Sequence, residues 1–187
     1  MRPLQSIGMG LVIVLVTASL GGYDLVADPV GWILVLIGVT KLTELPRQTT
    51  VELLAGLALA ASVLIWVPGL REALTGPDPA LAWAATLPQL ACCAVLCRGL
   101  GSLAGDAGDQ RASAWLGTAA VAFVVMAALP VLVFGGGIAS LEATAIVAAA
   151  LVLITLIWML FSYSGRPWAG PTEKQRGPHP PEEERPS

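Results

Sequence analysis

The residues of this chain that could do chemistry are few, and the most unusual pair is Pro88-Gln89, in the middle of a long apolar stretch. Pro88 has no amide proton for the helix ladder, so we expect it to free the carbonyl group of Ala84 and kink the helix. Gln89 carries a side-chain amide that must find hydrogen-bonding partners in hydrocarbon. Two interpretations stay open: the pair lines a polar pocket, or Gln89 bonds to a neighbouring helix and holds a bundle together.

A second candidate is the acidic pair Asp24 and Asp28, which are four residues apart in a short turn between apolar stretches. Two carboxylates at this spacing could chelate a divalent cation or divide acid and base roles. Asp28 precedes Pro29, however, and an Asp-Pro pair is typical of a helix start, where the carboxylate caps an amide and proline presets φ. Capping is the interpretation that we prefer, and we predict no metal site here.

Cys92, Cys93 and Cys97 share one apolar stretch at a spacing that suits a disulfide poorly, so we expect them to be small packing residues. Cys97 precedes Arg98 and could instead be acylated. No cofactor is predicted, since the one histidine, His179, lies in a polar tail and no Cys-x-x-Cys pair is present. No nucleophile motif, zinc-protease motif or phosphate-binding loop occurs, so we predict that the protein is not an enzyme.

The elements that must position these residues are long apolar segments. The chain of 187 residues is 56% hydrophobic and 12% charged, with a mean hydropathy of +0.76, whereas soluble domains are about 25% charged. Each segment approaches the ~17–25 residues that a helix needs to cross a bilayer. We therefore predict an all-α integral membrane protein, with a compact six-helix transmembrane domain over 1–163 and a disordered, proline-rich and charged tail over 164–187. The expected spans are 4–22, 29–45, 51–70, 80–97, 112–134 and 141–163.

The basic residues predict the orientation of this bundle. With alternating spans and an inside N-terminus, Arg71 is the only cation on the outer side. Such a bias in short loops favours three hairpins with both termini in the cytoplasm and the first span kept as an uncleaved anchor. Trp and Tyr residues cluster near the expected span ends, as they do at membrane interfaces. The nine inner cations are Arg2, Lys41, Arg47, Arg98, Arg111, Arg166, Lys174, Arg176 and Arg185.

The connections between the spans also carry local signals. Asp28-Pro29 and Asp78-Pro79 open the second and fourth spans by the same device, whereas a run of glycines at 135–137 marks the third outer turn. The Gly-rich segment 99–111 is expected to be the most flexible cytoplasmic loop. Small residues at helix-packing spacing, such as Gly31 with Gly38 and Gly56 with Ala60, indicate close packing within the bundle or between two copies.

The stretch from Tyr23 to Gly38 (Tyr-Asp-Leu-Val-Ala-Asp-Pro-Val-Gly-Trp-Ile-Leu-Val-Leu-Ile-Gly) resembles a segment of small uncharacterised bacterial multipass membrane proteins. Those segments read approximately Asp-x-x-Pro-Asp-x-x-Gly-aromatic before an apolar helix. Asp24, Gly31 and Trp32 fit this pattern, while Ala27 and Asp28-Pro29 depart from it. The resemblance covers 16 residues and implies a multipass fold without an assigned activity.

The functional expectation is a non-enzymatic accessory or scaffold protein, because the spans are uncharged and the loops are short. The alternative is a small permease or channel for a neutral or weakly polar solute, with Gln89 beside its path. An enzyme that uses Asp24 and Asp28 is a third hypothesis, but the sequence offers no nucleophile and base pair for it. The expected partners are the lipid bilayer and either a membrane protein or a second copy, with no nucleic acid. Eight Arg against two Lys in an Ala- and Gly-rich chain suggest a bacterial plasma membrane.

Overall fold

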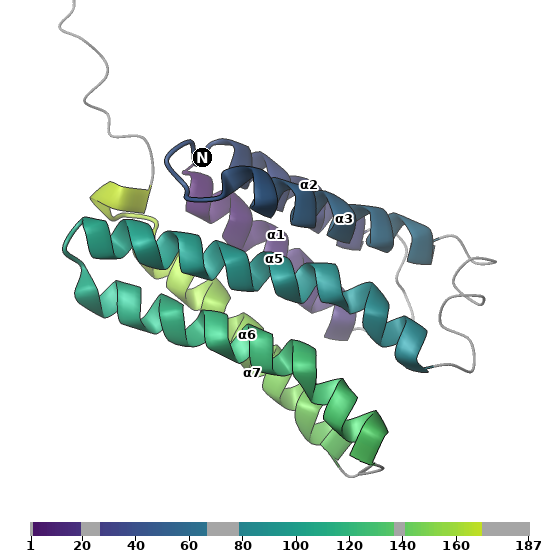
Figure 1. Ribbon diagram of the computed structural model, residues 1–187. Coiled ribbons are helices and arrows are strands. Elements are labelled where there is room, and N and C mark those ends of the chain that lie inside the picture. Colours follow the sequence, from purple (N-terminus) through teal and green to yellow (C-terminus); the bar gives the residue numbers. More distant parts are fainter. Residues whose placement is uncertain (1, 20–26, 67–78, 137–140, 170–187) are drawn as a thin grey trace, which may run out of the picture.

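The chain is all-helical wherever its structure is described. The computed structural model describes residues 2–19, 27–66, 79–136 and 141–169, and within these ranges there is no β-strand. The expected all-α class is therefore confirmed. The elements, labelled as in Figure 1, are α1 (Pro3–Ser19), α2 (Ala27–Thr40), α3 (Gln48–Trp66), α5 (Pro79–Asp106), α6 (Gln110–Gly136), α7 (Leu141–Tyr163) and the 3-10 helix η1 (Pro167–Ala169).

The six described α-helices follow one another around the molecule in chain order (Figure 1). Each one packs on its successor, and α7 returns to pack on α1. The core lies towards the end of the bundle where α1, α3 and α6 begin. Large apolar side chains fill this core and are almost wholly buried: Leu4, Ile7, Leu11, Trp32, Leu96, Leu100, Leu116, Leu156, Met159 and Leu160.

Within the described residues, three helices are long and apolar enough to cross a membrane: Gln48–Ile65 of α3, Trp83–Asp106 of α5 and Gln110–Leu129 of α6. Only 22% of the α3 stretch and 28% of the α6 stretch are buried inside the protein. Leu53 and Val121, for example, are 64% and 55% exposed. Large apolar surfaces of this kind are unfavourable in water, so they suggest a membrane protein. Pro3–Val16, Asp28–Thr40 and Val147–Tyr163 are shorter apolar helical stretches within the described residues.

Helices α1 and α2 cross where two glycines meet. A β-carbon added at Gly31 would lie 2.7 Å from the carbonyl oxygen of Gly10 and 2.8 Å from a methyl carbon of Val14. Only hydrogen side chains allow the backbones to come this close. The hydroxyl group of Ser6 donates a hydrogen bond of 3.0 Å to the carbonyl group of Leu34, which also joins the two helices. The expected close packing at Gly31 is thus present, and Gly38 is similarly tight against Pro3 and Ile7 of α1.

The segment 99–111, expected to be a flexible loop, is instead mostly helical, and this corrects the expectation. Helix α5 continues to Asp106, and α6 begins at Gln110. The turn between them is a Schellman motif: Gly108 has a φ of +82°, and the amide of Asp109 donates to the carbonyl group of Ala104 at 2.8 Å. The small residues of the segment do not break the helix because they let α6 pack closely, as at Gly101, where an added β-carbon would lie 3.4 Å from Leu116.

The beginning of the expected disordered tail is also folded. After α7, residues 164–169 form a turn and η1, which packs on α5. Ala169 is buried, and the rings of Trp168 and Tyr163 pack with their centroids 5.8 Å apart. These apolar contacts hold a segment whose proline content suggested disorder. Residues 170–187 of the expected tail lie outside the described residues.

The helix starts agree only in part with their local signals. Helix α5 begins at Pro79, directly after Asp78, as expected, whereas α2 begins at Ala27, so Asp28 lies inside its first turn and not at the expected N-cap position. Helix α6 runs to Gly136, so two of the three glycines expected in the third turn end that helix instead. The side chains of Asp78 and Arg71 lie outside the described residues.

Candidate functional site

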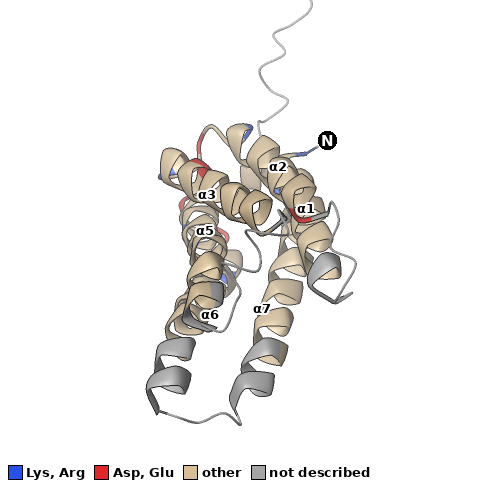
Figure 2. Cartoon of the chain, turned by 90° about the vertical axis from the view of Figure 1, so that its right-hand side faces the viewer, with Lys and Arg blue, Asp and Glu red and all other residues tan. Residues whose placement is uncertain are grey.

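All Lys and Arg residues of the described chain lie at or near one end of the bundle. The α2–α3 turn, the α5–α6 turn, the start of α1 and the end of α7 meet there (Figures 1 and 2). The Arg2 guanidinium donates a hydrogen bond of 3.2 Å to the carbonyl group of Ser164, so the first and last of these helices are joined directly. We call this the basic end; its residues are Arg2, Lys41, Arg47, Arg98, Arg111 and Arg166.

The α2–α3 turn at the basic end is held on both sides. Gln48 donates hydrogen bonds to the last carbonyl groups of α2, at Val39 and Thr40, and a shorter one of 2.8 Å to the Glu52 carboxylate. The preceding Leu45 is buried and packs on Gly99 of α5. Arg47 has a φ of +59°, which is uncommon for a residue with a β-carbon. The turn is therefore fixed by tertiary contacts at some cost in backbone strain.

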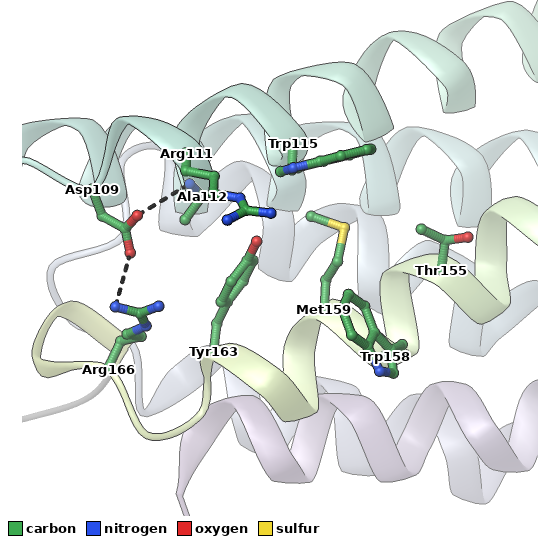
Figure 3. Close-up of a pocket in the computed structure, with 9 residues that line it drawn as sticks. All are labelled: Asp109, Arg111, Ala112, Trp115, Thr155, Trp158, Met159, Tyr163 and Arg166. Carbon is green, nitrogen blue, oxygen red and sulfur yellow. Dashed lines mark hydrogen bonds and ion pairs between the residues drawn. The ribbon is translucent and has the colours of Figure 1, made fainter.

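A pocket of about 400 Å³ opens at the basic end between the start of α6 and the end of α7 (Figure 3). Its lining is divided by chemistry: one part is charged, and the other is aromatic and apolar. The residues come from the first turns of α6, from the last turns of α7 and from the turn before η1. They are Asp109, Arg111, Ala112, Trp115, Thr155, Trp158, Met159, Tyr163 and Arg166.

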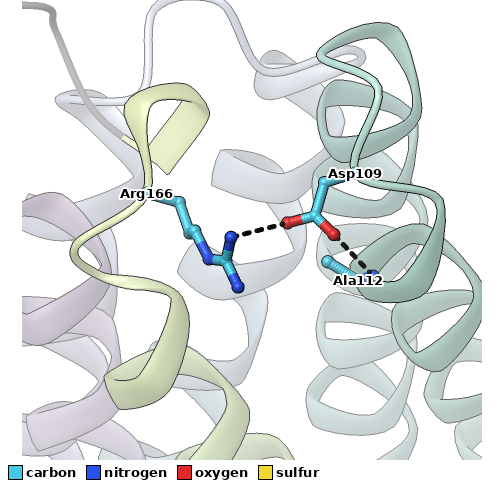
Figure 4. A network of polar contacts seen from close by, with 3 residues as sticks. All are labelled: Asp109, Ala112 and Arg166. Carbon is cyan, nitrogen blue, oxygen red and sulfur yellow. Dashed lines mark hydrogen bonds and ion pairs between the residues drawn. The ribbon is translucent and has the colours of Figure 1, made fainter.

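Asp109 links the two walls of the pocket (Figure 4). One carboxylate oxygen accepts a hydrogen bond of 3.2 Å from the amide of Ala112, which makes Asp109 the N-cap of α6. The other oxygen faces a guanidinium nitrogen of Arg166 at 3.6 Å. Since the Arg166 side chain is 55% exposed and the contact is long, we expect this ion pair to contribute at most about 1 kcal/mol. The ion pair positions the Arg166 side chain but engages only one of its guanidinium nitrogens.

Arg111 is the second cation of the pocket, and it forms no ion pair within the described part of the chain. Its guanidinium extends over the pocket towards the Tyr163 hydroxyl group, beside the ring of Trp115 (Figure 3). The pocket thus contains two guanidinium groups and one carboxylate, which leaves a net positive charge. Such an arrangement favours an anion, and guanidinium groups suit phosphate or carboxylate oxygens in particular.

The apolar part of the pocket faces away from the protein core. Trp115 and Trp158 are 53% and 68% exposed, while Met159 behind them is buried. Thr155 donates its hydroxyl group to the carbonyl group of Leu151 at 2.8 Å, so its hydrogen-bonding donor is already used. An exposed tryptophan pair beside arginines is typical of the level where a bilayer meets water.

The residues singled out from the sequence do not form this pocket. Pro88 and Gln89 lie inside α5, which continues through the proline, and both are half-buried. Within the described residues the Gln89 side chain makes no hydrogen bond. Asp28 is half-buried at the other end of α2 from the basic end, and Asp24 lies outside the described residues. No group of three His, Cys, Asp or Glu residues in the described ranges could hold a metal ion.

The three cysteines are buried in α5, in agreement with a packing role. Cys92 approaches the carbonyl group of Val51 in α3 at 3.8 Å. Cys97 is fully buried, and an acyl chain on its sulfur would have no room in this packing. The alternative of acylation at Cys97 therefore does not fit the structure.

In the sequence, Arg111 and Arg166 indicate only the orientation of the chain, and Asp109 falls in the segment 99–111 that is expected to be a flexible loop. The signal that could have identified the pocket was the recurrence of Trp115, Trp158 and Tyr163 near cations at expected span ends. The comparisons add nothing to this local information, since no family model, no curated protein and no solved structure matches the chain. The assignment of the candidate site therefore rests on its geometry alone.

Proposed function

We propose that the protein crosses the bacterial plasma membrane six times, with both termini in the cytoplasm. The gathering of the described cations at one end supports this orientation, because loops with an excess of Lys and Arg stay in the cytoplasm. The chain-order arrangement of six apolar helices supports the number of spans. In this orientation the pocket between α6 and α7 lies at the inner interface.

Cysteine labelling tests this topology with a membrane-impermeant maleimide on spheroplasts. Thr43 and Ala107 are exposed in the two turns of the basic end, and the native cysteines are buried, so background labelling is expected to be low. We expect Thr43→Cys and Ala107→Cys to react only after lysis and Thr75→Cys to react in intact spheroplasts. Labelling of Thr43→Cys and Ala107→Cys from opposite sides would contradict the span order. Labelling of both in intact spheroplasts would invert the orientation.

We infer that the protein acts as a non-enzymatic accessory or scaffold protein in this membrane. The observation that carries this inference is that apolar side chains fill the described core. Its members are apolar, and the only buried polar side chains among the described residues are Ser6 and Ser62, whose hydroxyl groups bond to backbone carbonyl groups. A path for a polar solute needs polar groups along its wall. The outer faces, by contrast, are free to contact other membrane proteins.

Helix α3 offers one such outer face. A β-carbon added at Gly56 would meet no atom within 4 Å, Ala60 is exposed one turn further on, and Leu53 and Leu57 flank them. Small residues at this spacing favour close approach of a second helix. Among the described residues, none packs on Gly56. This face is therefore the place to look for a partner.

Photocrosslinking from this face tests the accessory role. A photoreactive residue at Leu57 is expected to capture one partner protein in stoichiometric amounts in native membranes. The matched control is Val125 of α6, which is similarly exposed, at 53% against 49% for Leu57. Gly56→Leu should abolish the capture at Leu57. Lipid adducts alone from both positions would count against the proposal.

A permease for a neutral or weakly polar solute is the second candidate, and one observation favours it. The Gln89 amide is half-buried beside Pro88 and has no hydrogen-bond partner in the described ranges, so water or a solute could satisfy it. Solute flux into proteoliposomes tests this candidate. If Gln89→Leu abolishes the flux while circular dichroism shows an intact fold, the result would favour a permease over the accessory role.

A further inference from the structure

We propose that the pocket between α6 and α7 binds the phosphate group of an anionic phospholipid of the inner leaflet. The acyl chains would then run along the outer faces of the same two helices. This inference rests on the membrane placement proposed above but is independent of the accessory role. Four observations carry it: an unpaired arginine, a second arginine that is only loosely paired, an aromatic rim and a continuous apolar path away from the pocket.

The charged part of the pocket suits a phosphate monoanion. Arg111 is without an ion pair in the described chain, and Arg166 faces Asp109 at 3.6 Å through a single nitrogen. Two guanidinium groups and one carboxylate leave one net positive charge for one phosphodiester. The Tyr163 hydroxyl group, towards which Arg111 points in Figure 3, adds a neutral donor. Guanidinium groups bind phosphate oxygens with charge-assisted hydrogen bonds.

The apolar part points to a lipid rather than to a soluble phosphate. Of the neighbouring α-helix pairs, α6 and α7 pack together least extensively, and Trp115 and Trp158 flank the opening between them. From Trp158 an exposed apolar stripe continues along α7 at helical spacing, away from the basic end. Its members are Ile154, Leu151 and Val147. On α6 the apolar residues in helical register with Trp115 are Ala122, Met126 and Leu129, which are half-buried.

These two surfaces leave room for hydrocarbon beside a headgroup. A soluble ligand would bind the charged part and leave the tryptophans and the stripe in contact with bulk lipid. A phospholipid would use both parts, because its charged headgroup and its acyl chains belong to one molecule. The expected preference is therefore for an anionic headgroup over a zwitterionic one, since only the former keeps a net charge for Arg111.

Native mass spectrometry measures this preference directly. The full chain is kept in detergent, lipid is added in increasing amounts, and the lipid-bound fraction is measured after release from the detergent. The probes are phosphatidylglycerol and phosphatidylcholine with the same acyl chains. We expect phosphatidylglycerol to bind at least about tenfold more tightly, and Arg111→Gln to remove most of this advantage, because one charge-assisted hydrogen-bonding group is lost. The matched control is Arg98→Gln, which removes an exposed arginine of α5 that does not line the pocket.

For a second variant we expect the affinity for phosphatidylglycerol to change in the opposite direction. Asp109→Asn keeps an N-cap for α6 but removes the carboxylate that faces Arg166. Its affinity for phosphatidylglycerol should rise several-fold, while a purely structural role of Asp109 would lower it or leave it unchanged. Because one variant gains affinity, a general loss of folding cannot imitate the expected pair of results.

Soluble probes distinguish the two sources of phosphate. Inorganic phosphate and glycerol 3-phosphate are expected not to displace phosphatidylglycerol at millimolar concentration. Displacement by either would assign the pocket to a soluble phosphate compound and overturn the lipid proposal. Equal binding of both lipids, or equal losses in Arg111→Gln and Arg98→Gln, would also overturn it. Cysteine labelling tests the membrane placement separately, so a failure here leaves the topology standing.

Discussion

Gly31→Ala is expected to destabilise the protein by about 2 kcal/mol or more, although the same change in an open helix position stabilises. The added β-carbon would lie 2.7 Å from the backbone oxygen of Gly10, which cannot rotate away, and 2.8 Å from Val14. Helices α1 and α2 must then separate and lose contacts along their crossing. Unfolding in detergent micelles with increasing SDS, followed by circular dichroism, measures the change in free energy.

Gly56→Ala is the matched control for this prediction. Gly56 also lies within a helix, but an added β-carbon there meets no atom within 4 Å. The control should gain up to about 1 kcal/mol from the higher helix propensity of alanine. Equal effects of the two substitutions would show that the glycine contact is not tight and would contradict the crossing described here.

Trp32→Ala is expected to cost about 3 kcal/mol or more. Trp32 is 1% exposed and is the largest of the fully buried side chains in the described core. Its removal leaves a cavity that the surrounding helices can close only in part, and the van der Waals contacts of the ring are lost. The same unfolding assay, read as the shift in midpoint SDS fraction, gives the magnitude.

Two further variants identify the cause of that loss. Trp158→Ala removes the same ring from a position that is 68% exposed, and we expect a change below about 1 kcal/mol. Trp32→Phe keeps an aromatic ring and removes the indole N–H, which is buried and has no hydrogen-bond partner among the described residues. It should therefore cost far less than Trp32→Ala. A Trp32→Phe loss as large as that of Trp32→Ala would contradict this expectation.

The helices themselves were largely predictable because the signals that start them are local. Pro79 and Leu141 begin their helices where the sequence placed them, and Asp28 lies in the first turn of α2. The apolar segments overlap the helices, but α2 ends at Thr40, before the end of the expected span 29–45. The extension of α5 to Asp106 was not foreseen, because glycine weakens an isolated helix, whereas here close packing of α6 compensates.

The candidate site was much less predictable. Asp109, Arg111 and Trp115 come from one helix start, while Tyr163 and Arg166 come from a helix end more than fifty residues later. No local pattern specifies that these two segments meet. The Gln89 amide, by contrast, was conspicuous in the sequence but is not part of the described pocket. Polarity in an apolar run shows where a side chain is unusual and does not show what lies opposite.

The sequence by itself determined that this chain is helical and apolar, where most of its helices begin and which short segments carry its cations, because capping, hydropathy and charge act within a few residues. The tertiary structure alone decided that Gly10 faces Gly31, that the segment after α7 folds back on α5, and that two arginines and two tryptophans enclose one pocket. Those outcomes depend on how helices distant in sequence pack side by side, and packing is set by the shapes of both surfaces together.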